Sequence, residues 1–226
     1  MRPVEAIRAA ARQGAVLAVL ACGATAVLAQ GGFASPWPDD TTPVRLRVPS
    51  DYAQLQGWSA AGGSATMNLH YPSMRPWGVV AGCREWCEGK LLLVVRTGER
   101  SELNREVWSL RRAIAREAAA ASPTTAYTAR PPPAGYTEAW EERRLTPQAM
   151  PLLPEQRMLY LRIGPDGAPQ EYAQCAAAAG GAARCDTMTV LEGAPAVQLK
   201  YSFAAPHWAE RDAIRAAIMR LVRGWL

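Results

Sequence analysis

Cysteine is the residue type through which this chain could most directly do chemistry. Cys83 and Cys87 form a Cys-x3-Cys motif, and a thiolate pair of this kind can bind copper or shuttle electrons. Such a site is expected between a strand and a helix, with a distant histidine completing it. Here the motif precedes the predicted strand 90–97, and no Met or His cluster lies near it. The sequence therefore favours a structural disulfide, with a redox or copper role for Cys83 and Cys87 as the alternative.

Catalysis by other residue types is not indicated. The chain has two histidines, His70 and His207, and the segment around Ser64 lacks the Gly-x-Ser-x-Gly pattern of a serine nucleophile. The sequence contains neither a Gly-rich phosphate loop nor a His-x3-His zinc pair. We therefore predict a protein that is not an enzyme, with no catalytic residue, no metal and no cofactor.

Residues 1–29 have the composition of an export signal. Three arginines precede an uncharged apolar run, Gly14 to Ala29, which ends in a small-residue cleavage pattern. This run is shorter than the roughly 20 residues of a comfortable transmembrane helix. Cleavage is the favoured interpretation. The alternatives are a lipoprotein box with Cys22 as the lipidated residue, or an uncleaved signal anchor. All three predict a periplasmic protein that touches a membrane only through its N-terminus.

The four remaining cysteines agree with export. An even number of cysteines in an exported chain predicts disulfides, and four cysteines allow three connectivities. Local pairing, Cys83–Cys87 with Cys175–Cys185, is the simplest of the three. The net charge of the whole chain is +5, and the arginines are scattered rather than gathered into a stripe. We therefore predict no binding to nucleic acid.

Short alternating segments predict antiparallel strands, and two segments have helical periodicity. The predicted strands are 44–48, 67–71, 90–97, 157–163, 171–175, 187–191 and 197–203. One helix begins near Ser101, with apolar residues at Leu103, Val107, Leu110 and Ile114. The other follows Pro206, with Ile214, Ile218, Leu221 and Trp225 on its apolar face.

The order of these elements predicts an α+β protein of two similar halves, each an antiparallel sheet covered by one amphipathic helix. The second half has the same order of strands, cysteine-bearing loop, strand and helix as the first. The predicted segments are a signal (1–29), a flexible spacer (30–42), a first half (43–121), a Pro-rich linker (122–154) and a second half (155–226). Within the linker, residues 135–145 are expected to form either a short strand or one helical turn.

Four tryptophans are candidates for an interface with a partner. Trp58, Trp77, Trp86 and Trp140 lie in segments predicted as loops, where aromatic side chains can anchor a protein interface. The alternative is that they close the ends of the sheet.

Several of these segments together resemble a loose, largely uncharacterised group of exported proteobacterial proteins. The segments are 44–52 (VRLRVPSDY), 69–74 (LHYPSM), Tyr172 with Cys175 and Cys185, and Trp208 with Ile214 and residues 221–222. Some members of that group lie in type VI secretion or toxin–immunity loci. The resemblance implies a binding protein that blocks a toxin, with no chemistry of its own and no functional residue that can be transferred.

The main functional hypothesis is therefore a non-enzymatic periplasmic binding protein, an immunity or accessory protein whose partner is a toxin or an envelope component. The alternatives are an envelope redox or copper-handling protein using Cys83 and Cys87, and a structural lipoprotein anchored through Cys22.

Overall fold

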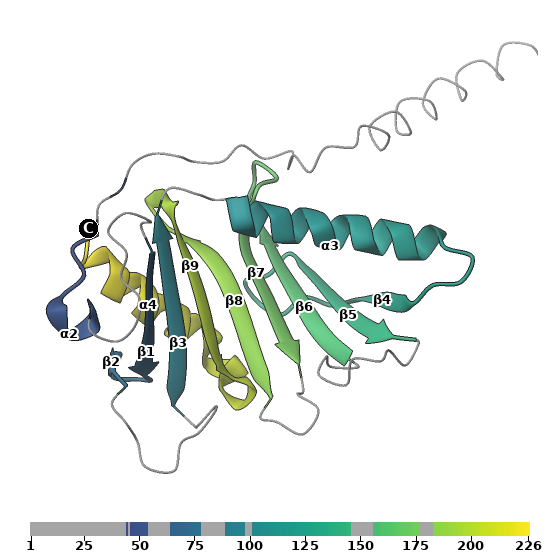
Figure 1. The fold of residues 1–226 in the computed structure, drawn as a ribbon. Coiled ribbons are helices and arrows are strands. Elements are labelled where there is room, and N and C mark those ends of the chain that lie inside the picture. Colours follow the sequence, from purple (N-terminus) through teal and green to yellow (C-terminus); the bar gives the residue numbers. More distant parts are fainter. Residues whose placement is uncertain are drawn as a thin grey trace, which may run out of the picture. The chain divides into compact units, whose positions relative to one another are not determined.

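The structure is a computed structural model that describes residues 44, 46–53, 64–77, 89–97, 101–145, 156–176 and 183–226. Within them, nine strands form one antiparallel sheet with helices on both faces (Figure 1). The helical elements are α2 (Ser50–Ala53), α3 (Ser101–Ala119), the 3-10 helix η1 (Ala205–Glu210) and α4 (Arg211–Arg223). The strands are β1 (Ser64–His70), β2 (Arg75–Pro76), β3 (Lys90–Thr97), β4 (Thr125–Arg130), β5 (Glu138–Arg144), β6 (Gln156–Ile163), β7 (Pro169–Ala176), β8 (Arg184–Leu191) and β9 (Ala194–Ala204).

The strand order is β2-β1-β3-β9-β8-β7-β6-β5-β4. From β4 to β9 the strands follow one another as hairpins, and β9 then pairs with β3 along seven residues. This pairing joins the N-terminal strands to the C-terminal ones in a single sheet. The 164–167 turn between β6 and β7 forms as predicted, with Gly167 at a positive φ of 79° that glycine adopts without strain.

The larger hydrophobic core lies between α4 and the strands β1, β3 and β9. Alternate residues of β1 and β3 are buried there because successive side chains of a strand point to opposite faces. Leu91, Leu93 and Leu199 are fully buried in this core. From α4, Ile214 and Ile218 are fully buried against them.

The smaller core lies on the opposite face, beneath α3. Leu103 and Val107 of α3 pack on Leu159 and Leu161 of β6. Gln198 of β9 has the opposite orientation to Leu199, and its Oε1 accepts a hydrogen bond of 3.3 Å from the Leu103 N–H. The two helices therefore cover opposite faces and largely different strands (Figure 1).

The α+β class and the antiparallel sheet are confirmed, but the structure does not show two similar halves. The helix of the predicted first half, α3, packs on β6 and β7 of the second half. The helix of the second half, α4, packs on β1 and β3 of the first. Amphipathicity identifies the buried face of a helix but not the strands that it covers, so the sequence could not assign these partners.

Two segments differ from their predicted local structure. Strands β4 and β5 both lie inside 122–154, where the sequence predicted a Pro-rich linker. Residues 44–48 alternate like a strand, but the described residues among them, 44 and 46–48, form none. Instead Leu46 is buried in the larger core, and the Arg47 N–H donates to the Trp225 carbonyl over 2.7 Å. Tertiary contact, rather than strand pairing, explains this alternation.

The predictions for the signal (1–29) and spacer (30–42) lie outside the described residues. In the described part of the chain, no helix is long and apolar enough to cross a membrane.

Candidate functional site

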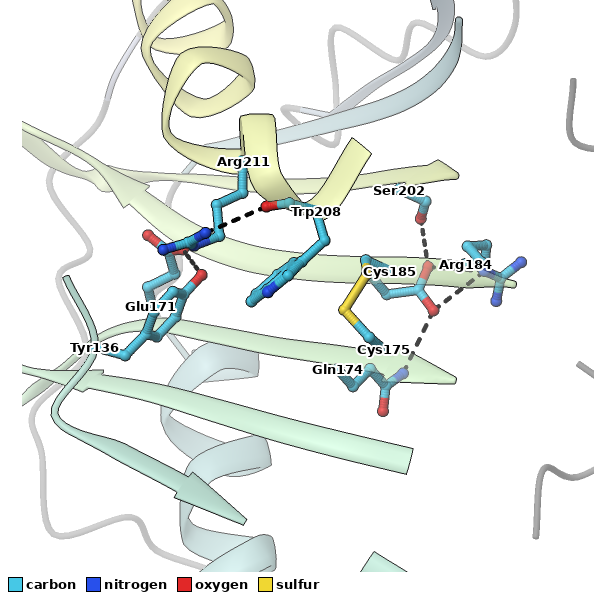
Figure 2. The surroundings of a disulfide bond; sticks show 10 residues. Tyr136, Glu171, Gln174, Cys175, Arg184, Cys185, Ser202, Trp208 and Arg211 are labelled. Carbon is cyan, nitrogen blue, oxygen red and sulfur yellow. Dashed lines mark hydrogen bonds and ion pairs between the residues drawn. A yellow bond between two sulfur atoms is a disulfide. The ribbon is translucent and has the colours of Figure 1, made fainter. Parts of the chain in front are cut away.

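Two polar clusters lie near the Cys175–Cys185 disulfide, one on each face of the sheet (Figure 2). The two cysteines are direct partners in the β7–β8 register, with Cα atoms 4.1 Å apart. The bridge faces the larger core, where Cys185 is fully buried. The neighbouring pair in the register, Gln174 and Asp186, faces the α3 side because strand side chains alternate.

A polar groove lies on the α3 side of β7, β8 and β9. It has a volume of about 180 Å3, and its walls are Tyr172, Gln174, Arg184, Asp186, Met188 and Lys200. Helix α3 packs on Tyr172 and Met188 at one end of this surface. The polar residues of the groove lie beyond that contact.

A chain of hydrogen bonds crosses five strands and includes Gln174 and Asp186 of the groove wall. On β5 and β6, both oxygens of Glu142 accept from the Arg157 guanidinium at 2.9 Å. Arg157 Nη1 also donates to Gln174 Oε1 at 2.9 Å. Gln174 Nε2 donates to Asp186 Oδ2 at 3.5 Å, and the Ser202 hydroxyl donates to Asp186 Oδ1. Each side chain is held by its neighbours, so the polar surface around Gln174 and Asp186 is pre-formed.

Glu142 stabilises the positive charge of Arg157 in this network. Burial disfavours the guanidinium of Arg157, but its hydrogen bonds and ion pair with Glu142 outweigh that effect and raise its pKa. The pKa of Tyr172 is also raised, chiefly because the phenol is buried, and the charge of Arg157 opposes that rise. At neutral pH the network therefore has a charged Arg157 and a neutral Tyr172.

The rim of the groove carries accessible charge. Arg184 retains 46% of its side-chain exposure and Lys200 retains 38%, whereas Asp186 retains 18%. Arg184 Nε lies 3.1 Å from Asp186 Oδ1, and Lys200 Nζ lies 3.6 Å from Glu102 Oε1. Ion pairs this exposed contribute little to folding. The cations can therefore contact a partner without a large loss of stability.

The cluster on the other face is closed. Glu171 is only 2% exposed, and its Oε1 accepts a hydrogen bond of 2.6 Å from the Tyr136 hydroxyl (Figure 2). Its Oε2 lies 3.1 Å from Arg215 Nε and 3.8 Å from Arg162 Nη2. Burial, together with the charge of Glu171, raises the pKa of Tyr136 well above its usual value. These groups compensate one another inside the protein.

Stacked aromatic rings extend this cluster toward η1. The Trp208 ring lies 4.5 Å from the Tyr160 ring and 5.9 Å from the Tyr136 ring, measured between centroids. The Arg211 guanidinium lies 5.1 Å from the Trp208 ring and donates to the Ala134 carbonyl at 3.1 Å. Rings and guanidinium together hold η1 and the start of α4 against β6. This arrangement stabilises the fold and offers no open site.

The structure describes only some of the predicted site residues. Trp77 is half-buried, and its ring stacks on His70 with 5.2 Å between centroids. Trp140 lies in β5 rather than in a loop, and it packs against the smaller core. Of the two alternatives for residues 135–145, a short strand or one helical turn, the strand is the one that forms. The predictions for Cys22, Trp58, Cys83, Trp86 and Cys87 lie outside the described residues.

Sequence reasoning missed the groove. A signal for it was present in β9, where Gln198, Lys200 and Ser202 alternate with buried apolar residues and so had to face away from the larger core. The neighbours that these side chains meet on β7 and β8 depend on strand register, which alternation does not give. Within the described residues, no group of three His, Cys, Asp or Glu side chains could hold a metal ion.

Comparison with known proteins finds one informative structure. No family model and no curated protein matches the chain. A solved structure of an immunity protein of the Stenotrophomonas maltophilia type IV secretion system is similar, with 14% sequence identity and a TM-score of 0.51. The match covers 83% of this chain and 92% of that one. At this identity the likeness shows a shared fold. The matched protein comes from a type IV system and not from the type VI loci that the sequence resemblance implied.

Proposed function

We propose that this chain is a non-enzymatic immunity protein that binds a toxin and blocks it in the periplasm. The observation that carries the proposal is the fold, which matches that of an immunity protein across most of both chains. The match includes nearly all of the other protein, so the likeness is not confined to one common motif.

The disulfide supports the proposed location. Disulfides persist in oxidising compartments such as the bacterial periplasm and are rare in the cytosol. The Cys175–Cys185 bridge closes the β7–β8 hairpin, and the predicted signal at 1–29 would deliver the chain to that compartment.

The groove on β7–β9 is the surface that we propose for toxin contact. Its wall residues Gln174 and Asp186 are held by hydrogen bonds from Arg157 and Ser202, and its rim carries Arg184 and Lys200. A pre-formed surface loses little side-chain entropy when a partner docks, which favours tight binding. The Glu171 cluster does not offer such a surface to a partner, because its charges are already compensated within the protein.

Growth rescue with a stoichiometry measurement tests the proposal. Each toxic product encoded beside this chain in its own locus is exported to the periplasm of a test host, with or without the chain. We expect the chain to restore growth against one of them and to form a complex of fixed stoichiometry with it. Rescue by amounts of the chain far below those of the toxin would indicate turnover and overturn a binding function. If the chain restores growth against none of them, the proposed immunity function is overturned.

A further inference from the structure

The two edges of the sheet are protected very differently. At one edge lies β2, which has two residues. At the other lies β4, which has six residues and, within the described part of the chain, pairs only with β5. Short edge strands resist pairing with another chain, whereas a longer edge presents a row of backbone donors and acceptors. The β4 edge is therefore the better candidate for an interaction.

The register shows which backbone groups of β4 point outward. The Leu145 N–H donates to the Thr124 carbonyl over 2.9 Å, so these two residues form a hydrogen-bonded pair. Such pairs alternate along an antiparallel ladder, so Ala126, Thr128 and Arg130 point their N–H groups toward β5. Tyr127 and Ala129 point theirs away from the sheet.

Both ends of this outer edge are already closed. The Thr125 N–H, which also points outward, donates to Glu117 Oε2 of α3 at 3.3 Å. At the other end Pro131 follows the strand, and proline has no N–H to donate. The accessible part is therefore the short segment containing Tyr127 and Ala129, which is long enough for an extended peptide of a few residues.

Side chains beside this segment carry an excess of positive charge. Arg130 and Arg143 lie on the same face of β4 and β5, and both are exposed. Glu141 binds Arg130 through Oε2 and accepts from Gln156 Nε2 at 2.7 Å through Oε1. Arg143 forms no ion pair with any described residue. Its charge remains available to an acidic group.

We propose that the outer edge of β4 accepts an extended segment of a partner protein as an additional strand, with one acidic side chain of that segment near Arg130 and another near Arg143. Main-chain hydrogen bonds to Tyr127 and Ala129 hold such a segment, and the arginines select its charge. A second copy of this chain fits less well, because pairing β4 with itself brings two positive patches together. The edge lies across β5 and β6 from the groove, so this interaction goes beyond the proposed function.

Amide hydrogen exchange on the purified protein tests this proposal. We expect slow exchange at Ala126, Thr128 and Arg130 and fast exchange at Tyr127 and Ala129. A blocked hexapeptide of alternating Glu and Val should slow the Tyr127 and Ala129 amides by about tenfold, whereas a Lys-Val hexapeptide should not. The proposal is overturned if the Glu-Val peptide leaves both amides unchanged. It is also overturned if they become protected without peptide as the protein concentration rises, because a second copy then occupies the edge.

Two variants locate the binding. Ala129→Pro removes an outward N–H without breaking a bond to β5, so the sheet should remain while the peptide no longer slows the Tyr127 amide. Arg143→Glu leaves the backbone unchanged and should reverse the preference toward the Lys-Val peptide. Thr128→Ala is the matched control and should behave like the parent. If Arg143→Glu keeps the original preference, the charge argument is wrong and the proposal falls.

Discussion

The two polar clusters beside the disulfide contain the same kinds of residues but have opposite consequences. On the α4 face, Glu171 is 2% exposed and lies among Tyr136, Arg162 and Arg215. On the α3 face, Asp186 is 18% exposed and lies in a groove with Arg184 and Lys200 at its rim. Buried ions must be compensated within the protein, whereas water partly screens the charges at a rim. We infer that the first cluster holds the fold together and the second is available to a partner.

Among the variants that test this comparison, Glu171→Ala is expected to cause the largest loss of stability. It leaves the Arg215 guanidinium without its buried carboxylate and the Tyr136 hydroxyl without an acceptor, which should cost about 3–5 kcal/mol of unfolding free energy. Urea denaturation measures this loss. Glu192→Ala is the matched control, because Glu192 also binds Arg215, at 2.7 Å, but is 60% exposed. It should cost at most about 1 kcal/mol. Equal losses in the two variants would contradict the distinction between the clusters.

Removing the disulfide should have the next largest effect. With Cys175 and Cys185 both replaced by alanine, the unfolded chain is no longer constrained by a bridge spanning 10 residues. We expect the free energy of unfolding to fall by about 2–4 kcal/mol. Denaturant titration measures it, and toxin binding under conditions where the variant is folded should persist. If binding is lost from the folded variant, the bridge shapes the groove directly.

Lys200→Ala should weaken toxin binding while leaving the fold nearly unchanged. We expect about a tenfold loss of affinity, equivalent to about 1.4 kcal/mol, because a rim cation is lost. The ion pair of Lys200 with Glu102 is partly exposed, so the free energy of unfolding should change by less than about 1 kcal/mol. Calorimetric titration with the toxin measures the affinity. Arg112→Ala removes one exposed charge from α3, outside the groove, and should leave the affinity unchanged. Equal losses in both variants would show that net charge, and not the groove, controls binding.

The smallest expected difference concerns two buried tyrosines, Tyr136 in the Glu171 cluster and Tyr172 in the groove wall. Burial raises the pKa of both above the usual value of 10.0. The unfolded state therefore loses these protons first, and the stability that they contribute falls as the pH rises above 10.0. Up to about pH 11 both tyrosines keep their protons in the folded state, and the unfolded state loses them to the same degree. Tyr136→Phe and Tyr172→Phe should therefore flatten the alkaline loss to the same extent.

Denaturation from about pH 8 to about pH 11 measures the change in slope for each variant. Each variant is compared with the parent at every pH, so that the loss of a hydroxyl hydrogen bond at neutral pH cancels. A smaller change in slope for one variant would mean that its tyrosine also loses its proton in the folded state, which contradicts burial of that hydroxyl.

Elements whose neighbours in sequence determine their structure could be predicted well. The segment 90–97 is a β-branched, apolar run between polar residues, and β3 has those bounds. The helix predicted from Ser101 forms α3, and its apolar residues Leu103 and Val107 are fully buried. The 164–167 turn likewise depends only on local glycine and proline chemistry.

Elements that depend on distant contacts were predicted poorly or not at all. The described residues of the predicted strand 44–48 form no strand, and the Arg47 N–H instead bonds to the carbonyl of Trp225, far away in the sequence. The sequence could not distinguish strand β5 from a helical turn, because its charged residues Glu142 and Glu138 have their arginine partners, Arg157 and Arg111, on other elements. No local sequence pattern predicts those ion pairs.

The sequence by itself determined the class of the fold, most of its strands and helices, and the cysteines suited to an oxidising compartment. These properties follow from periodicity and composition, which are local. Only the tertiary structure decided that one sheet joins the whole described chain, that each helix covers strands from the other predicted half, and that Gln174, Asp186 and Lys200 share a groove. Those outcomes depend on the register of β9 between β3 and β8, and strand register is set by packing between segments that are distant in the chain.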